Sequence, residues 1–135
     1  MNGLDATLNA WQPRMLSVMR IVAGLLFMQH GLSKHFAFPI AYVGGKFPAF
    51  GQIWFAGWIE IIGGALLVLG LFTRWAALLC SGLMAFAYFL GHQHRGLFPL
   101  ANAGNLAILY CFVFFYIFFA GPGPWSVDGT RQGKS

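Results

Sequence analysis

Residues 53–72 form an apolar stretch in which Glu60 is the single charged residue. A helix of about 20 residues, rising ~1.5 Å per residue, crosses a hydrocarbon core of ~30 Å. The stretch therefore predicts a membrane-spanning helix. The other two acidic residues, Asp5 and Asp128, fall in polar tails. A carboxylate inside a span is unfavourable by about 3 kcal/mol or more, so we expect Glu60 to face other helices and to be paired or protonated.

Small residues surround Glu60 on its own helix. Gly57, Gly63 and Gly64 lie three or four residues away and fall on the same side of the helix, as does Ala56. A groove of small residues lets a second helix approach closely. We therefore expect Glu60 to lie in a helix–helix seam, with Gly63 and Gly64 against a neighbouring helix.

The overall composition is typical of a membrane protein. The 135 residues are 59% hydrophobic and 8% charged, whereas a soluble domain carries about 25% charged residues. The length suits one compact bundle without a separate soluble catalytic domain. The eight basic residues are scattered and form no nucleic-acid-binding motif. The lipid bilayer is the expected partner, and nucleic acid is not.

Four apolar segments predict an all-α fold, an integral membrane four-helix bundle that occupies residues 1–135 as one domain. The expected helices cover residues 13–33, 53–72, 75–91 and 104–120. Pro13 is suited to the first turn of a helix. The Gly-Pro-Gly-Pro run at residues 121–124 cannot continue one.

Four spans place both chain termini on one side of the membrane. The basic residues expected on that side are Arg14, Arg20, Arg74, Arg131 and Lys134, against Lys34, Lys46 and Arg95 on the other. Cytoplasmic sides carry the excess of Lys and Arg. The asymmetry predicts a multi-pass membrane protein with both termini in the cytoplasm.

The first segment carries candidate partners for Glu60. The residues that share one face of this segment are Arg20, Gly24, Phe27, Gly31 and Lys34. His30 flanks that face, and counting ~1.5 Å per residue from the cytoplasmic ends puts it within about one turn of Glu60 in depth. We therefore expect His30 to be the first partner of Glu60, ahead of Arg20 and His92. Lys34 is expected to extend towards the membrane surface.

The histidines suggest neither a metal site nor a haem site. His92 and His94 are two residues apart, a spacing that suits metal ligation poorly on a helix, and no cysteine or acidic residue lies nearby in the sequence. A haem held by His30 and His92 has no specific support. We expect no covalently bound cofactor and treat a quinone as the candidate. The candidate catalytic residues are Glu60 and His30, and the candidate substrate-binding residues are Arg20, Lys34, Tyr88, His92 and Asn105.

Taken together, these features resemble the DoxX family of small four-helix membrane proteins, over nearly the whole chain. The matching residues are Arg20, Gly24, Gly31, Lys34, Glu60, Gly63, Gly64, Gly70, Thr73, Arg74, Met84, Ala85, Gly121, Pro122, Gly123, Ser126 and Asp128. The resemblance implies a bacterial inner-membrane protein linked to redox chemistry. Members or relatives serve as subunits of a thiosulfate:quinone oxidoreductase or associate with thiol- and superoxide-stress enzymes. The family's fourth helix commonly begins with a glutamate, where this chain has Asn105.

The leading hypothesis is a quinone-interacting membrane subunit that acts with a redox partner protein. Glu60, with His30 or His92, would exchange the protons of quinone chemistry, while the quinone carries the electrons. Two alternatives stay open, and with them the question of whether the chain is an enzyme. One is a non-enzymatic anchor for a redox or detoxification complex. The other is a pathway for protons or a small solute.

Overall fold

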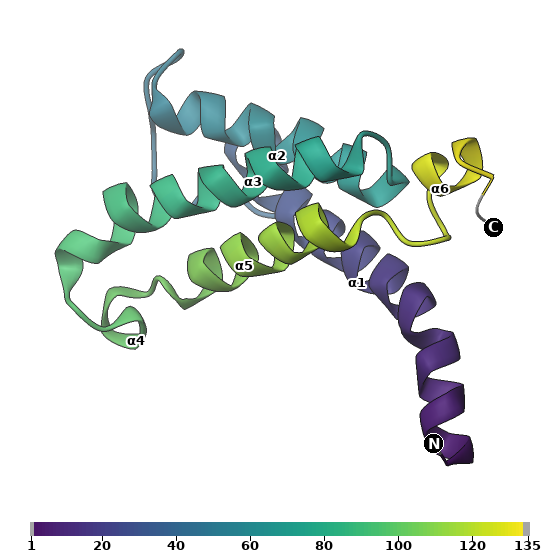
Figure 1. The fold of residues 1–135 in the computed structure, drawn as a ribbon. Helices are drawn as coiled ribbons and strands as arrows, with labels where there is room; N and C mark the ends of the chain where they lie inside the picture. The colour runs from purple at the N-terminus through teal and green to yellow at the C-terminus, as the bar shows by residue number, and fades with distance from the viewer. Residues whose placement is uncertain (1, 134–135) are drawn as a thin grey trace.

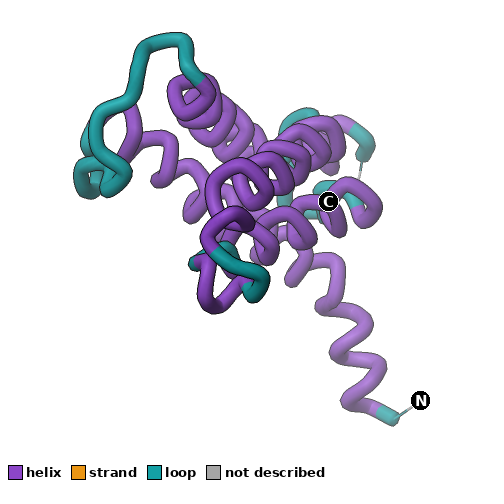
Figure 2. Tube along the Cα trace, turned by 90° about the vertical axis from the view of Figure 1, so that its left-hand side faces the viewer, coloured by secondary structure: helices purple, strands orange, loops and turns teal. Residues whose placement is uncertain are grey.

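The computed structural model describes residues 2–133, and within that range the chain is all-helical, without strands (Figure 2). The main helices are α1 (Gly3–Phe36), α2 (Gln52–Leu69), α3 (Thr73–Ala87) and α5 (Asn105–Ala120). The short elements are a π-helical turn (Tyr88–His92), a 3-10 turn (Gln93–Arg95), α4 (Pro99–Asn102) and α6 (Val127–Arg131). The predicted all-α class is confirmed.

Three helical stretches are long and apolar enough to cross a membrane. They are α1, α2 and the continuous stretch Thr73–Arg95, in which α3 runs on through the two short turns. α5 is apolar but has only 16 residues. At ~1.5 Å per residue it is about 24 Å long, slightly less than a ~30 Å hydrocarbon core. The membrane character is confirmed, and the fourth helix is the short one.

The helices pack as two antiparallel pairs. α1 lies along α2, α3 lies along α5, and contacts between α2 and α3 join the pairs. Both termini lie at one end of the bundle, on the right in Figure 1, whereas the loop of residues 37–51 and α4 lie at the other. The two pairs meet through Phe27 and Phe114, which are fully buried with ring centroids 4.8 Å apart.

α1 begins ten residues earlier than the sequence predicted. Its N-cap is Asn2, whose side chain accepts a hydrogen bond from the Asp5 backbone nitrogen at 2.8 Å. Pro13 therefore lies inside the helix and not at its start. The expectation was wrong because a good cap and an acidic first turn favour an earlier start, and one interior proline does not cancel them. The first part of α1, drawn in purple, extends away from the other helices (Figure 1).

A glycine seam brings α1 and α2 together. Gly24 and Gly31 of α1 face Gly64 and Gly57 of α2, so both helices use a spacing of seven residues. A Cβ atom on Gly24 would lie 3.0 Å from the Gly64 carbonyl oxygen. Such close backbones need residues without side chains. The predicted seam is confirmed on this side of α2.

The other glycine next to Glu60 serves a different neighbour. A Cβ atom on Gly64 would lie 2.8 Å from the Met28 Cβ of α1, whereas Gly63 faces the Cys80 sulfur of α3. Glu60 lies on the same side of α2 and is 4% exposed. The prediction that both glycines lie against neighbouring helices, with Glu60 shielded between them, is therefore confirmed.

The ends of α2 and α3 differ slightly from the expected ranges, whereas α5 ends at the predicted residue. α2 ends at Leu69, three residues early, because Gly70 adopts the left-handed conformation (φ 68°) and closes the helix. α3 then starts directly at Thr73 and continues into the turn that ends at His92. α5 ends at Ala120, and Gly121 follows with a φ of 88°.

Candidate functional site

The two charged residues of the α1–α2 seam form a buried ion pair. Lys34 Nζ donates to Glu60 Oε1 at 2.9 Å and to Oε2 at 2.7 Å. The Lys34 side chain is 12% exposed and that of Glu60 is 5% exposed. One ammonium group therefore neutralises a carboxylate that would otherwise lie alone in the membrane interior.

Gly31 makes this pairing possible. A Cβ atom at Gly31 would lie 3.0 Å from the Glu60 Cβ and 2.7 Å from Ile61 Cγ1, so α1 passes directly over this part of α2. Lys34 is almost one turn further along the same face of α1. Its flexible side chain needs to fold back by only about a turn to reach Glu60.

The predicted partner of Glu60 was wrong. Among residues 2–133, Glu60 has its ion pair with Lys34, and the ring of His30 instead lies edge-on to Tyr110 of α5, with centroids 6.1 Å apart. The depth of His30 was estimated correctly, because its neighbour Gly31 lies opposite Glu60. One residue along a helix turns the side chain by about 100°, which directs His30 towards α5 and not towards α2.

Aromatic rings surround the ion pair on the side of the 37–51 loop. Lys34 Nζ lies over the Tyr42 ring, 5.3 Å from its centroid. His35 stacks on Trp58 with centroids 4.5 Å apart, and its Nε2 donates to the Trp54 carbonyl at 2.9 Å. Tyr42 and His35 are site residues that the sequence analysis missed. The aromatic character of the loop was the available signal.

On its inner side the pair borders two further titratable residues. Cys80 of α3 and Tyr110 of α5 both lie within electrostatic range of Glu60. Cys80 is fully buried, and Tyr110 is in contact with Phe27 and Phe114 of the core. The Lys34/Glu60 pair of α1 and α2 thus lies within electrostatic range of groups on α3 and α5, and it is the polar centre of the bundle.

Arg20 was a candidate for substrate binding, but its guanidinium group is occupied by the protein backbone. The side chain is fully buried. Its Nε donates to the Pro122 carbonyl at 2.8 Å, Nη1 donates to Leu67 at 2.7 Å and to Val68 at 3.2 Å, and Nη2 donates to Trp125. Leu67 is about two turns from Glu60 along α2. Arg20 therefore joins the end of α2 to the C-terminal segment, away from Glu60.

Asp128 does not lie in a polar tail, which corrects the sequence interpretation. Its carboxylate accepts hydrogen bonds from the Phe72 nitrogen at 3.1 Å and from the Thr73 nitrogen and Oγ1, both at 2.8 Å. Asp128 therefore caps the N-terminus of α3 from a distant part of the sequence. Burial raises the pKa of this carboxyl, but the hydrogen bonds from Thr73 and Phe72, with the charge of Arg131, hold the pKa below its usual value.

The replacement Asp128→Asn should lower the stability of the protein at neutral pH by about 1 kcal/mol, the usual effect of losing a helix cap. Because the folded-state pKa of Asp128 is lowered, its contribution is present above about pH 4 and is lost as the pH falls through that pKa. Melting curves of the wild type and Asp128→Asn should therefore differ at pH 7 and converge near pH 2. Curves that stay separated by the same amount at both pH values would contradict this role.

The other three candidates for substrate binding, Tyr88, His92 and Asn105, lie near the turn between α3 and α5. His92 Nδ1 donates to the Asn102 carbonyl at 3.1 Å, and Asn102 Nδ2 donates to the Tyr88 hydroxyl at 3.2 Å and to the Gly96 carbonyl at 3.0 Å. Asn102 is almost fully buried and was missed, because a single asparagine in a loop carries no distinguishing pattern. Asn105 is exposed at the start of α5. Within residues 2–133, no hydrogen bond joins this group to Glu60.

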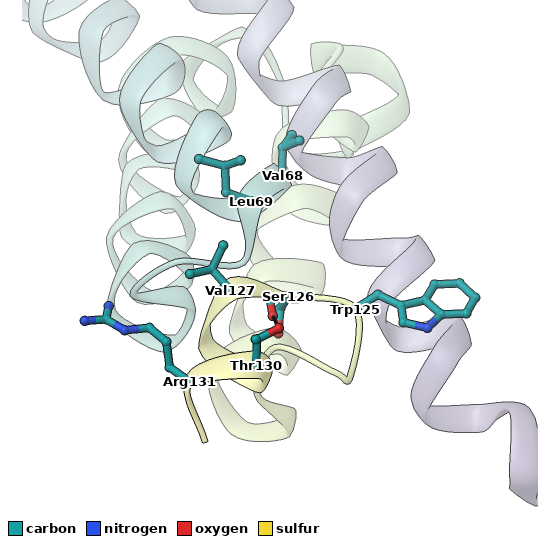
Figure 3. Close-up of a pocket in the computed structure, with 7 residues that line it drawn as sticks. All are labelled: Val68, Leu69, Trp125, Ser126, Val127, Thr130 and Arg131. Atoms are coloured by element: carbon teal, nitrogen blue, oxygen red, sulfur yellow. Dashed lines mark hydrogen bonds between the residues drawn. The ribbon is translucent and has the colours of Figure 1, made fainter. Parts of the chain in front are cut away.

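Two surface hollows lie at the other end of the bundle, near the termini. The first, of about 450 Å³, lies between the end of α2 and α6 (Figure 3). The second, of about 610 Å³, lies between α1, α5 and the start of α3. Neither is lined by Lys34 or Glu60. The ion pair is almost fully buried, with side chains 12% and 5% exposed.

Metal ligation has no geometric basis in the part of the chain that the structure describes. No group of three or more His, Cys, Asp or Glu residues between positions 2 and 133 could hold a metal ion. Cys80 and Cys111 are free thiols, and the Ser81 hydroxyl donates to the Cys111 carbonyl at 2.8 Å.

Of the basic residues expected at one end, Arg20 and Arg74 lie at the end with the termini, bonded to backbone carbonyls of the C-terminal segment and of α5 respectively. Lys134 falls outside the described residues. Which side of the membrane this end faces stays a prediction.

Comparison with known proteins gives one family and two relatives. The DoxX family model matches residues 15–93. An uncharacterized protein of Haemophilus influenzae is 44% identical over 126 residues, which cover 90% of this chain and 93% of that protein. An uncharacterized membrane protein of Mycobacterium tuberculosis is 31% identical over 139 residues, with coverage of 90% and 83%. No solved structure matches the chain. The region matched by the family model includes both members of the buried ion pair.

Proposed function

Since the chain belongs to the DoxX family, we propose that it is a quinone-interacting membrane subunit whose proton-exchanging group is the Lys34/Glu60 pair. The observation that supports this is the burial of the pair at the end of the bundle that carries the aromatic loop. Buried ionisable residues within membrane spans are expensive and commonly mark proton or substrate pathways. The pair also lies within electrostatic range of Cys80 of α3 and Tyr110 of α5.

The surroundings of the pair suit a flat ring with polar oxygens. Lys34 is a hydrogen-bond donor for a ring carbonyl, and the rings of Tyr42 and Trp58 provide faces for stacking. The loop of residues 37–51 is mostly exposed and carries Tyr42 over the pair, whereas Trp58 belongs to α2. A quinone would enter from the bilayer by displacing loop side chains and leaving the helix seam intact.

Reduction of a quinone to the quinol requires two electrons and two protons. In this proposal the electrons come from a redox protein that acts with the chain. The Lys34 ammonium donates a proton to a ring oxygen, and the carboxylate of Glu60 favours recharging of the amine from water. The step repeats for the second ring oxygen, so that the quinol leaves with both protons and the ion pair is restored.

The test is quinone binding to the purified protein. We expect the wild type to retain quinone in a lipid extract and Tyr42→Leu to lose at least tenfold in quinone affinity, because the ring over Lys34 is removed while the ion pair remains. Glu60→Gln, which keeps the shape but removes the charge, should abolish quinone-linked activity in cells. Phe98→Leu, an exposed aromatic change in the other loop, is the control and should bind normally. Normal binding and full activity in both site variants would reject the proposal.

A non-enzymatic anchor is the second candidate. It is supported by the structural roles of several motif residues, since Arg20, Thr73 and Asp128 hold helix ends together. The same extraction separates the two functions. A quinone-free extract from protein that co-purifies with an intact enzyme would favour the anchor.

A further inference from the structure

The first helix, α1, is longer than a membrane span. Its 34 residues correspond to about 51 Å at ~1.5 Å per residue, against a hydrocarbon core of ~30 Å. The buried residues of α1 start at Ser17, whereas residues 2–15 are all exposed. About 20 Å of the helix, at its N-terminal end, therefore lies outside the hydrocarbon core.

This N-terminal part does not continue straight out of the bundle. It runs across the direction of α2 and α3 (Figure 1). Figure 2, which views the bundle from the end opposite the termini, shows the same part of α1 pointing sideways from the other helices. Because α2 and the stretch that begins with α3 are the membrane-crossing helices, the N-terminal part of α1 runs along the membrane surface.

Pro13 accounts for the direction of this bend. The ring of a proline inside a helix clashes with the carbonyl four residues earlier, so the helix opens on the proline side and bends towards the opposite face. The proline side faces the C-terminal segment, because a Cβ atom on Gly123 would lie 3.0 Å from the Pro13 carbonyl oxygen. Ser17, one turn further, is fully buried. The first part of α1 therefore bends away from the bundle and towards the surrounding lipid.

The inner side of the bend is apolar. Leu4, Leu8 and Trp11 are the large apolar residues of positions 3–12, and the remaining positions are polar or small. Pro13 follows Leu4 by nine residues, about two and a half turns, so the apolar face is opposite the proline. At steps of three, four or seven residues the same face continues into exposed residues further along α1, namely Met15, Val22 and Leu26.

We propose that residues 3–12 form a membrane-surface helix, with Leu4, Leu8 and Trp11 inserted among the lipids at the end of the bundle where the termini lie. The bilayer is the partner of this apolar face, because the same face of α1 contacts lipid along the span. Trp11 suits this level, since tryptophan is enriched at membrane–water interfaces.

The sequence of this segment also defines how it attaches. Positions 3–12 contain no lysine or arginine, so the attachment depends on apolar insertion and not on anionic headgroups. A helix held at the surface keeps α1 from sliding along its own axis. The site is distant from the Lys34/Glu60 pair along α1, and the proposal does not depend on quinone binding.

The experiment measures the reactivity of introduced cysteines in the full chain, with one copy in each lipid nanodisc. Leu8→Cys is on the apolar face, and Ala6→Cys, two residues earlier, is the matched control on the opposite face. We expect Leu8→Cys to react with a membrane-impermeant maleimide about tenfold more slowly than Ala6→Cys, in phosphatidylcholine and in phosphatidylglycerol alike. The wild type, with Cys80 and Cys111, gives the background rate.

Three results would overturn the proposal. Equal rates for Leu8→Cys and Ala6→Cys would mean that the segment projects into water. Protection of Leu8→Cys only in phosphatidylglycerol would mean that headgroup charge holds the segment. Protection that is absent in single-copy nanodiscs but present in vesicles with many copies would mean that a second copy of the chain covers the apolar face.

Pro13→Ala tests the bend. Alanine is the best helix former, so this variant should fold. A straighter α1 directs the apolar face away from the membrane surface, and we expect Leu8→Cys to react as fast as Ala6→Cys in the Pro13→Ala background. Protection of Leu8→Cys that persists without the proline would overturn the role of Pro13 in placing the segment.

Discussion

Replacing Lys34 with methionine should lower the free energy of unfolding by about 3–5 kcal/mol, because it leaves the Glu60 carboxylate buried without its counter-ion. The loss would be measured by thermal and denaturant unfolding in one detergent. Lys46→Met provides the matched control, since Lys46 is exposed in the 37–51 loop and should change stability by no more than about 0.5 kcal/mol.

The double variant Lys34→Met with Glu60→Leu separates pairing from burial. Replacing a buried ion pair with apolar residues of similar volume is often neutral or stabilising. We therefore expect the double variant to recover most of the lost stability while failing to bind quinone. A double variant as unstable as Lys34→Met alone would show that the pair itself is needed for the fold. One that folds and still supports quinone-linked activity would reject proton exchange at this site.

The sequence predicted the α1–α2 seam well, because the relevant rules are local. Helical periodicity alone places Gly57, Gly63 and Gly64 beside Glu60, and the structure confirms that these glycines contact neighbouring helices. The end of α5 was also predicted correctly, because Gly121 and the prolines after it cannot continue a helix. Each inference needed only residues within a few turns of one another.

The partner of Glu60 was harder to predict. The depth of a side chain in the membrane follows from its position along the helix, but the direction in which it points depends on where the other helices lie. His30 and Lys34 are one turn apart, and the sequence gives their depth to within about that distance. The direction depends on where α5 lies, which the sequence does not specify. Lys34 was expected to extend outwards, as lysines near span ends commonly do, but it lies on the same face as Gly31 and folds back to Glu60.

The contacts of Arg20 and Asp128 could not be predicted from the sequence for a different reason. Each joins segments about 50 or more residues apart, and no periodicity connects such positions. Arg20 lies in the region matched by the family model and Asp128 lies beyond it, yet both satisfy backbone groups at helix ends. The region matched by the family model therefore contains both Arg20, which holds the bundle together at the end with the termini, and the Lys34/Glu60 pair near the aromatic loop.

Arg20→Met should destabilise the protein by more than about 4 kcal/mol. The guanidinium donates to four backbone carbonyls, two in the last turn of α2 and two in the C-terminal segment. Each buried carbonyl that loses its partner costs about 1–3 kcal/mol. Arg20→Lys should fall between the wild type and Arg20→Met, because one ammonium cannot reproduce the planar fork of donors.

Unfolding in detergent gives the size of the effect, and limited trypsin cleavage at Arg131 reports where it acts. With Arg20 removed, the C-terminal segment keeps the hydrogen bonds from the Trp125 nitrogen to Ser17 Oγ and from the Asp128 nitrogen to the Gly70 carbonyl, but loses its two bonds to the guanidinium. We therefore expect cleavage there before global unfolding. Arg14→Met is the control. Arg14 is exposed, and within residues 2–133 it contacts only its own helix, through the Ala10 carbonyl and the Trp11 ring, so its loss should change stability by about 0.5 kcal/mol or less. If Arg20→Met melted like Arg14→Met, the four carbonyls would have to find other donors. The C-terminal segment would then be held mainly by the Asp128 cap on α3.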